Sequence, residues 1–246
     1  MRLVSLCPSL TESLVALGAG GDLVGATRYC VHPREALAGV RRVGGTKNPD
    51  LEAIRLLAPD LVLANAEENR EQDLADLARD LPVDVSHPRT VAEVPALLRR
   101  LGERTGRAEA GGAWARRVEE RLAAVRARSW PPFRFVYLIW KEPFMAAVSG
   151  TYIADLIATF GGVDALGGTG EPYPRVTAEE VVASRPDWIF LPDEPYRFAD
   201  GDREWWSRLV PACRVERVAG DDLCWHGVRT LRGLDLLERL LGGAGR

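Results

Sequence analysis

The stretch AEAGGAWARRVEERLAAVRAR, Ala108–Arg128, decides the fold. Its apolar side chains recur every three or four residues, which places them on one face of a helix: Trp114, Val118, Leu122 and Val125. Charged residues dominate the other faces, and Pro131-Pro132 forbids continuation of the helix. A helix of about 20 residues is about 30 Å long, close to the diameter of a small domain. The sequence therefore predicts one long helix that bridges two parts of the chain.

Similar segments lie on either side of this helix. They are LEAIRLLAPDLVLA, Leu51–Ala64, and AEEVVASRPDWIFL, Ala178–Leu191, and each predicts a short helix, a Pro-Asp stop and a buried strand. Such a repeat predicts an α/β fold of two similar lobes with mainly parallel sheets, joined by the long backbone helix, with a ligand cleft between the lobes. The expected parts are residues 1–107, the helix 108–130 and residues 131–246. Chance recurrence of a common helix–strand join is the alternative.

The composition is that of an ordinary globular protein. Of 246 residues, 46% are hydrophobic and 27% charged, enough for a core in each of two lobes. The net charge of −3 provides no basic surface for nucleic acid or an anionic membrane, so we expect neither partner. No apolar run approaches about 18 residues, so we expect no membrane-embedded segment. We expect a monomer.

The beginning and the cysteines bear on localisation. Only one arginine and a few apolar residues precede Pro8, which is too short a stretch for the apolar region of a signal peptide. As written, the chain is expected in the cytoplasm, or in the periplasm or at the cell surface if the true start lies upstream. The cysteines form no C-x-x-C pair, so we expect reduced thiols: Cys7, Cys30, Cys213 and Cys224.

Local signals mark the helix starts. Ser9 with Glu12, and Thr177 with Glu180, both fit a capping box. Asn48 fits an N-cap, with Pro49 as the first helical residue. Strands alternate with helices in both lobes, which predicts parallel sheets that bind ligands beyond the carboxyl ends of their strands.

Aromatic residues gather in the loops that follow the predicted strands. Such residues suit a large, flat and mostly apolar ligand. Packing between the lobes is the alternative for any one of them. The aromatic candidates are Tyr29, Trp140, Phe144, Tyr173, Tyr196 and Trp225.

Cysteine and histidine residues project from the same loops. Both are ligands of zinc and of haem or corrinoid metals. No pair has the spacing of a zinc ribbon, so ordinary loop residues are the alternative to direct metal ligation. The metal candidates are Cys30, His32, Cys224 and His226, with Cys7 close to them in the predicted fold.

Charged residues give two further candidates. Glu68 and Arg70 stand at a helix start, and we interpret them as a salt-bridge network that orients the ligand-side loop. The alternatives are a catalytic carboxylate site that includes Glu67, or a solvated first turn whose charges match the helix dipole. Glu52 and Glu179 occupy equivalent places in the repeat and could dock two basic patches of a dimeric partner; ordinary surface glutamates are the alternative. No serine nucleophile elbow, phosphate-binding loop or H-E-x-x-H motif occurs, so we expect no enzyme.

Four motifs resemble a known family. They are RLVSLCPSLTE at Arg2–Glu12, VGGTKNPDLE at Val43–Glu52, APDLVLAN at Ala58–Asn65 and RPDWI at Arg185–Ile189. Together they resemble the cobalamin and siderophore substrate-binding proteins of ABC importers, which have two α/β lobes bridged by one long helix. The resemblance covers nearly the whole chain.

This resemblance implies specific roles for several residues. It implies a corrinoid or iron-chelate ligand held with little hinge motion, and ligand contacts at Pro8, next to Ser9, and at Tyr29. It also implies docking of Glu52 and Glu179 onto arginines of a permease dimer. Two departures are the missing export signal and Gly45-Thr46-Lys47, which stands where cobalamin binders commonly have tryptophan.

The sequence therefore predicts a solute-binding protein that holds a cobalamin-like or iron-siderophore chelate, with no cofactor required. The alternatives are a cytosolic metal- or haem-binding protein that uses the Cys and His residues, or an enzyme acting on a corrinoid-like molecule.

Overall fold

The computed structural model describes residues 1–168 and 170–243, and the chain divides into two compact units. Unit 1 comprises Met1–Pro88, Glu93–Glu119 and His226–Arg229, and unit 2 comprises Arg89–Ala92, Glu120–Trp225 and the chain from Thr230 onward. The cleft expected between the lobes stays a prediction.

Unit 1 is built on a five-stranded sheet in which every neighbouring pair is parallel, in the order β3-β2-β1-β4-β5. Its strands are β1 (Leu3–Ser5), β2 (Leu23–Ala26), β3 (Arg41–Arg42), β4 (Leu61–Asn65) and β5 (Val83–Ser86). Its main helices are α1 (Pro8–Ala16), α2 (Leu51–Leu56), α3 (Glu71–Leu77) and α4 (Val94–Arg104). Its 3₁₀ turns are η1 (Gly20–Asp22), η2 (Glu35–Leu37) and η4 (Gly227–Arg229).

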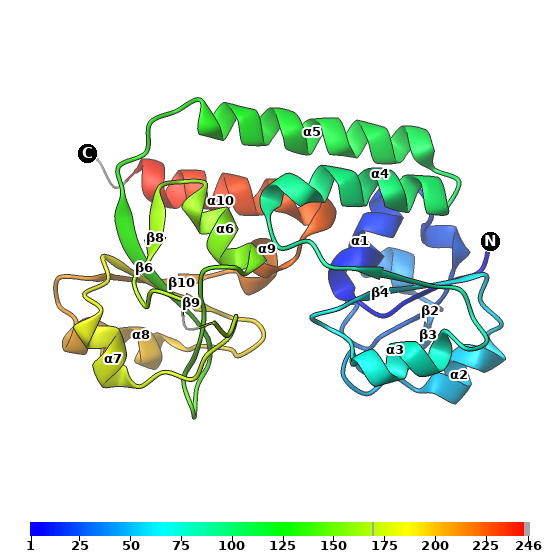
Figure 1. The fold of residues 1–246 in the computed structure, drawn as a ribbon, viewed down its shortest axis with the longest axis horizontal. Helices are drawn as coiled ribbons and strands as arrows, with labels where there is room; N and C mark the ends of the chain where they lie inside the picture. Colours follow the sequence, from blue (N-terminus) through cyan, green and yellow to red (C-terminus); the bar gives the residue numbers. More distant parts are fainter. Residues whose placement is uncertain (169, 244–246) are drawn as a thin grey trace. The chain divides into compact units, whose positions relative to one another are not determined.

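Both faces of this sheet are covered. Figure 1 shows α1 and α4 on one face and α2 and α3 on the other. Val4 of β1 and Val62 of β4 pack with Ile54 of α2 and Leu77 of α3 in one buried cluster. The central strands β1 and β4 are buried along their whole length, because a parallel sheet with helices on each face has no solvated side there.

Unit 2 is built on a mixed sheet in the order β10-β9-β6-β7, with β8 paired to β6. Only β7 runs antiparallel to its neighbour β6. The strands are β6 (Phe133–Trp140), β7 (Met145–Ala147), β8 (Gly162–Asp164), β9 (Trp188–Pro192) and β10 (Arg214–Val218). The helices are α6 (Tyr152–Ala158), α7 (Ala178–Ala183), α8 (Asp200–Leu209), α9 (Gly220–Cys224) and α10 (Thr230–Gly242), and η3 covers Val91–Glu93.

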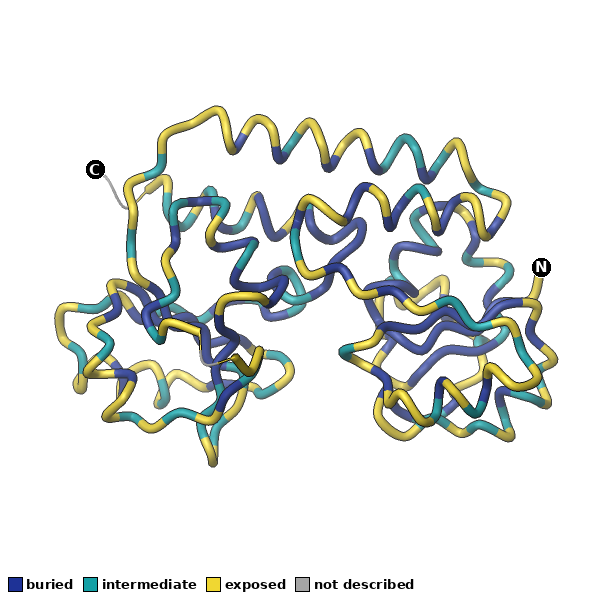
Figure 2. The backbone as a smooth tube through the Cα atoms, in the orientation of Figure 1, coloured by how far each residue is buried: buried dark blue, intermediate teal, exposed yellow. Residues whose placement is uncertain are grey.

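The long helix is confirmed as α5 (Ala108–Arg126). Val118, Leu122 and Val125 are buried and the charged positions between them are exposed, an alternation that can be followed along α5 in Figure 2. In unit 1 the Trp114 indole donates a hydrogen bond to the carbonyl of Ala16 (3.1 Å). Ala108–Glu119 belongs to unit 1 and Glu120–Arg126 to unit 2. None of the helices in the described part of the chain is long and apolar enough to cross a bilayer.

The sequence repeat extends to atomic detail. In unit 1 the Arg2 backbone N–H donates to the Asp60 carboxylate (2.7 Å), and in unit 2 the Arg134 N–H donates to Asp187 (2.6 Å). The Arg2 side chain also donates to the Leu57 carbonyl at the end of α2, and the Arg134 side chain donates to the Ser184 carbonyl at the end of α7. The same clasp therefore fixes the helix–strand join in both units.

Two predicted helix starts are wrong, and a third is confirmed. Cys7, not Ser9, is the N-cap of α1, because Ser9 and Glu12 contact His226 and Arg229 instead of the helix backbone. Asp50, not Asn48, caps α2 by accepting a hydrogen bond from the Ala53 N–H (2.9 Å), while Asn48 accepts one from Arg28. The capping box of Thr177 and Glu180 is present. Strands β7 and β8 and helix α9 were not predicted.

The repeat also places the backbone of two non-glycine residues in the left-handed φ/ψ region. Ala58 (φ +41°) and Arg185 (φ +48°) follow the ends of α2 and α7, where glycine is usually favoured. We expect Ala58→Gly to raise the free energy of unfolding by about 0.5–1 kcal/mol, measured by urea denaturation. The same change inside α2, Ala53→Gly, should lower it by about 1 kcal/mol. A loss of stability in both variants would contradict the assigned backbone strain.

Candidate functional site

The carboxyl ends of the strands in unit 1 bring polar residues to one edge of the sheet. Strands β1, β4 and β5 end at Ser5, Asn65 and Ser86, and parallel strands place these ends together. The Ser86 hydroxyl donates to the Ala64 carbonyl (3.0 Å). Segment His226–Arg229 joins this edge from a distant part of the sequence.

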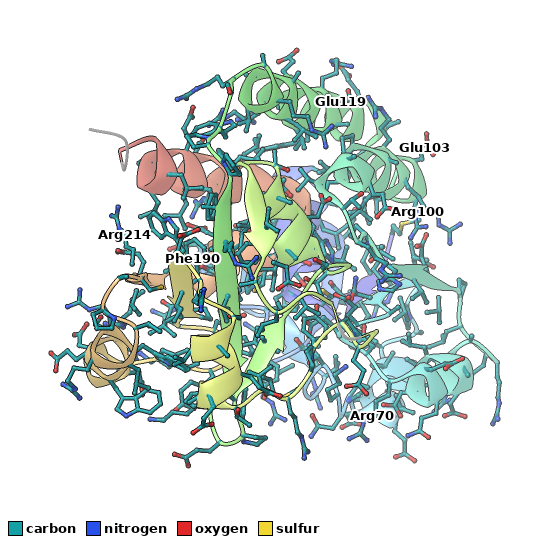
Figure 3. The ribbon with its side chains drawn as sticks, turned by 60° about the vertical axis from the view of Figure 1, so that its left-hand side comes forward. Arg70, Arg100, Glu103, Glu119, Phe190 and Arg214 are labelled. Carbon is teal, nitrogen blue, oxygen red and sulfur yellow. The ribbon has the colours of Figure 1, made fainter. Side chains whose placement is uncertain are left out.

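The loop after β4, residues 65–70, is held by its two asparagines. The Asn65 side-chain oxygen accepts hydrogen bonds from the N–H groups of Glu67 (2.9 Å) and Glu68 (3.2 Å). The Asn69 side chain accepts from the Asn65 N–H (2.9 Å) and donates to the carbonyls of Leu6 and Thr46. These contacts fix a loop that leaves Glu68 and Arg70 exposed. Figure 3 labels Arg70 just before α3.

Glu68 has a basic neighbour and a hydrogen-bond donor. Its carboxylate accepts a hydrogen bond from the Thr46 side chain and lies near the Lys47 ammonium. Although the residue as a whole is exposed, desolvation of its carboxylate raises the pKa of Glu68, and the smaller opposite effects of Lys47 and Thr46 do not cancel this rise. The Lys47 ammonium also donates to the Glu67 carbonyl. The Gly45-Thr46-Lys47 segment thus contacts the loop that carries the two predicted ligand residues.

His226 is buried at the same edge, with 7% of its surface exposed. Its Nε2 lies 3.1 Å from the Asn65 side-chain nitrogen and 3.3 Å from the Ser9 hydroxyl. Burial, with a smaller contribution from His87, lowers the pKa of His226 to about 4. The imidazole is therefore neutral at physiological pH.

The predicted metal ligands do not gather into one group. Cys30 is buried and its sulfur lies 3.0 Å from the Thr11 hydroxyl and 3.2 Å from the Thr27 hydroxyl, while His32 is exposed. Burial raises the pKa of the Cys7 and Cys30 thiols, so both stay protonated. Cys224 ends α9 in unit 2. Within residues 1–168 and 170–243, no group of three or more His, Cys, Asp or Glu side chains could hold a metal ion.

An exposed aromatic residue follows β2 in unit 1. Tyr29 is 53% exposed, and the Arg28 guanidinium lies 5.4 Å from its ring centre. Pro8 is buried as the first residue of α1, with Ser9 beside it. Of these three predicted contact residues, Tyr29 offers the largest surface to a ligand.

Aromatic residues also follow β6 and β9 in unit 2. Trp140 is 42% exposed, and its ring meets that of Tyr196 edge to face with centres 5.5 Å apart. Phe144 is half-buried and stacks against Trp205, with centres 5.9 Å apart. The structure thus brings Trp140 and Tyr196 together and turns Phe144 toward α8.

Trp225 and Tyr173 are less available. Trp225 is only 5% exposed, and its indole N–H donates to the Glu194 carboxylate (2.9 Å). Tyr173 is half-buried in the loop before α7. Trp225 is therefore a packed residue at the end of α9, and little of its ring is accessible for stacking against a ligand.

Glu52 and Glu179 have matching surroundings. Each is exposed and is the second residue of its helix, α2 or α7. Each helix begins with a side-chain N-cap, Asp50 or Thr177, so the two carboxylates stand in equivalent positions on the two units.

Asn65 and Asn69, which hold the loop 65–70, were not singled out from the sequence. An asparagine directly after a buried strand, with a second one four residues later, is a usable signal because such side chains bind nearby backbone groups.

Comparisons with known proteins agree with the fold. A family model described as "Periplasmic binding protein" matches residues 3–203. The vitamin B12-binding protein of Vibrio cholerae is 28% identical over 243 residues, which cover 97% of this chain and 87% of that protein.

Solved structures show the same similarity. The crystal structure of the periplasmic vitamin B12 binding protein of Vibrio cholerae is similar with a TM-score of 0.89 at 26% identity, covering 100% of this chain and 98% of that one. The periplasmic heme-binding protein of Roseiflexus sp. RS-1 is similar with a TM-score of 0.85 at 25% identity, covering 99% and 98%.

The buried His226 makes stability depend on pH. Its pKa falls from 6.5 to about 4 on folding, so between these pH values the imidazole is mostly protonated in the unfolded chain and mostly neutral in the folded chain. We expect this residue to remove about 3 kcal/mol of unfolding free energy as the pH falls from 6.5 to 4. Urea denaturation across that range should show a shallower decline in His226→Gln than in wild type. The exposed control His32→Gln should match wild type, and equal slopes in all three proteins would contradict the assignment.

Proposed function

Because the chain belongs to the periplasmic binding protein family, we propose that it is the solute-binding component of an ABC importer whose ligand is a corrinoid or another large metal chelate. The relatives named above bind vitamin B12 or haem, and both ligands are wide planar macrocycles around a chelated metal.

The observation that carries this proposal is the exposure of large aromatic side chains at the strand ends of both units. Tyr29 and Trp140 leave about half of their surface in water, although burying a large apolar side chain is worth about 1.5–3 kcal/mol. A flat ligand that covers such rings recovers part of this free energy by stacking. Each strand-end edge is proposed to contribute contacts to the ligand.

The polar residues of unit 1 complete the proposed contacts. Glu68 and Arg70 stand on a loop fixed by Asn65 and Asn69, so their ordering cost is small when the ligand arrives. Such residues suit the polar side groups at the rim of a macrocycle. The apolar plane and polar rim of a corrinoid match this division.

The proposed function is binding without chemistry. Ser9 and Cys7 are buried, and the pKa of the Cys7 thiol is raised, so neither is an activated nucleophile. Because Cys30 is also buried and protonated, we do not extend the proposal to a bare metal ion held by Cys and His.

The proposed partner is a permease dimer in the membrane, which this protein would meet on the side outside the cytoplasm. Glu52 and Glu179 offer two equivalent carboxylates, one on each unit, which suit two equivalent basic patches of a symmetric partner. A monomeric binding protein with two such docking points fits this arrangement.

The ligand is tested with cyanocobalamin. We expect purified protein to retain the cobalamin visible spectrum through gel filtration at one ligand per chain. Trp140→Ala should weaken binding about tenfold or more, because it removes an exposed stacking ring, whereas Leu56→Ala on the exposed surface of α2 should bind like wild type. Retention of haemin but not cyanocobalamin would move the ligand to the haem class, and retention of neither would overturn the proposal.

The docking role is tested by charge reversal. We expect Glu52→Arg with Glu179→Arg to abolish ligand uptake in cells that carry the cognate permease, because each change places like charges together. Ligand affinity in solution should stay unchanged. The matched control Glu71→Arg, in the first turn of α3, should leave uptake near the wild-type rate. Normal uptake by the double variant would refute docking through these residues.

A further inference from the structure

The Asn65 side chain can take only one orientation. Its oxygen faces the backbone N–H groups of Glu67 and Glu68, at 2.9 and 3.2 Å, and a backbone N–H can only donate. The amide NH₂ must therefore face the other way. There it meets the Nε2 of His226 at 3.1 Å and the Ser86 hydroxyl at 3.5 Å.

This orientation fixes the state of the imidazole. Because the Asn65 NH₂ group donates, Nε2 of His226 must accept and carries no proton. A neutral imidazole then carries its proton on Nδ1. The Ser9 hydroxyl lies 3.3 Å from Nε2 and 3.4 Å from Nδ1, so it can donate to the first or accept from the second in this tautomer.

We propose that His226 is a positioning residue for the ligand-side loop 65–70, because its Nε2 holds the Asn65 amide in the orientation that binds the Glu67 and Glu68 N–H groups. The link from this loop to a ligand rests on the proposed function. The positioning itself rests only on contacts inside unit 1.

The imidazole is itself held in place. Arg229, 3% exposed, donates two hydrogen bonds to the Glu12 carboxylate, at 2.6 and 2.8 Å. The Val228 N–H donates to the Ser13 hydroxyl (3.2 Å). Both partners lie on α1, so the segment that carries His226 is anchored to a helix of the same unit. A fixed acceptor can fix the asparagine that donates to it.

Losing the acceptor has a specific consequence. Without Nε2, the Asn65 NH₂ group keeps only its longer contact with the Ser86 hydroxyl, at 3.5 Å. The amide is then held less firmly, and each turn of it removes the acceptor from two backbone N–H groups. The loop would then lose its shape while the sheet beneath it stays intact. A residue that only fills space would not show this dependence on one ring nitrogen.

Two substitutions separate these roles. In His226→Gln the side-chain oxygen takes the place of Nε2, and in His226→Asn it takes the place of Nδ1. We would measure amide hydrogen exchange by ¹H–¹⁵N NMR at Glu67 and Glu68. We expect exchange at both to quicken at least tenfold in His226→Asn and to change less than threefold in His226→Gln. The Leu6 amide, bonded to the Leu63 carbonyl inside the sheet, should stay protected in both and reports that the unit is folded.

The wild-type protein gives a second readout that needs no substitution. Imidazole ¹⁵N spectra at neutral pH should show an unprotonated Nε2 and a protonated Nδ1 for His226. The opposite tautomer would overturn the proposal. So would equal exchange rates at Glu67 and Glu68 in the Gln and Asn variants.

Cyanocobalamin binding separates the two proposals. We expect His226→Asn to bind at least fivefold more weakly than His226→Gln. If wild-type protein binds no cyanocobalamin, the proposed ligand fails, while the exchange and tautomer measurements still decide the positioning role. If wild type binds and the two variants bind equally, the loop's orientation by His226 has no effect on the ligand, and its link to binding fails.

Discussion

Parallel strand pairing is the constraint on which both units depend. A parallel strand needs a crossover to reach its neighbour, so each strand is followed by a loop and a helix, and all the loops after the strands meet at one edge. In unit 1 this edge carries Tyr29 and the loop 65–70, and in unit 2 the corresponding edge of its own sheet carries Trp140 and Tyr196. The one antiparallel pair, β6 with β7, turns the chain back directly after Trp140. The topology of each sheet alone thus places the loops that carry the candidate site residues at one edge of that sheet, whatever their side chains are.

At the strand-end edge of unit 1, the side-chain amides of Asn65 and Asn69 fix the conformation of the loop 65–70. Asn65 and Asn69 replace missing backbone partners with side-chain oxygens and nitrogens, and they tie the loop to Leu6 and Thr46. The exposed Glu68 and Arg70 are therefore carried on a fixed backbone. Preorganisation of this kind lowers the entropy cost of binding, which area alone does not reveal.

Prediction from the sequence succeeded where the determining contacts are local. The α5 helix follows from apolar spacing, and the Thr177–Glu180 capping box formed because both partners lie within one helical turn. The Ser9–Glu12 box was wrong because His226 and Arg229, more than 200 positions away, take both side chains. Trp225 was predicted as a contact surface and is 5% exposed, since its burial depends on tertiary packing. The spacing of apolar residues indicates which face of a helix is buried, but it does not indicate which polar residue of a distant segment contacts that helix.

The His226–Arg229 segment also governs how the molecule can be made. It completes the polar edge of unit 1, yet most of unit 2 precedes it in the sequence and leaves the ribosome before it. A growing chain can form the parallel sheet of unit 1 early, but Ser9, Asn65 and Glu12 meet their partners only after most of unit 2 has been synthesised. Pairings across such sequence distances form slowly. A chain that ends before residue 226 therefore leaves its first unit incomplete.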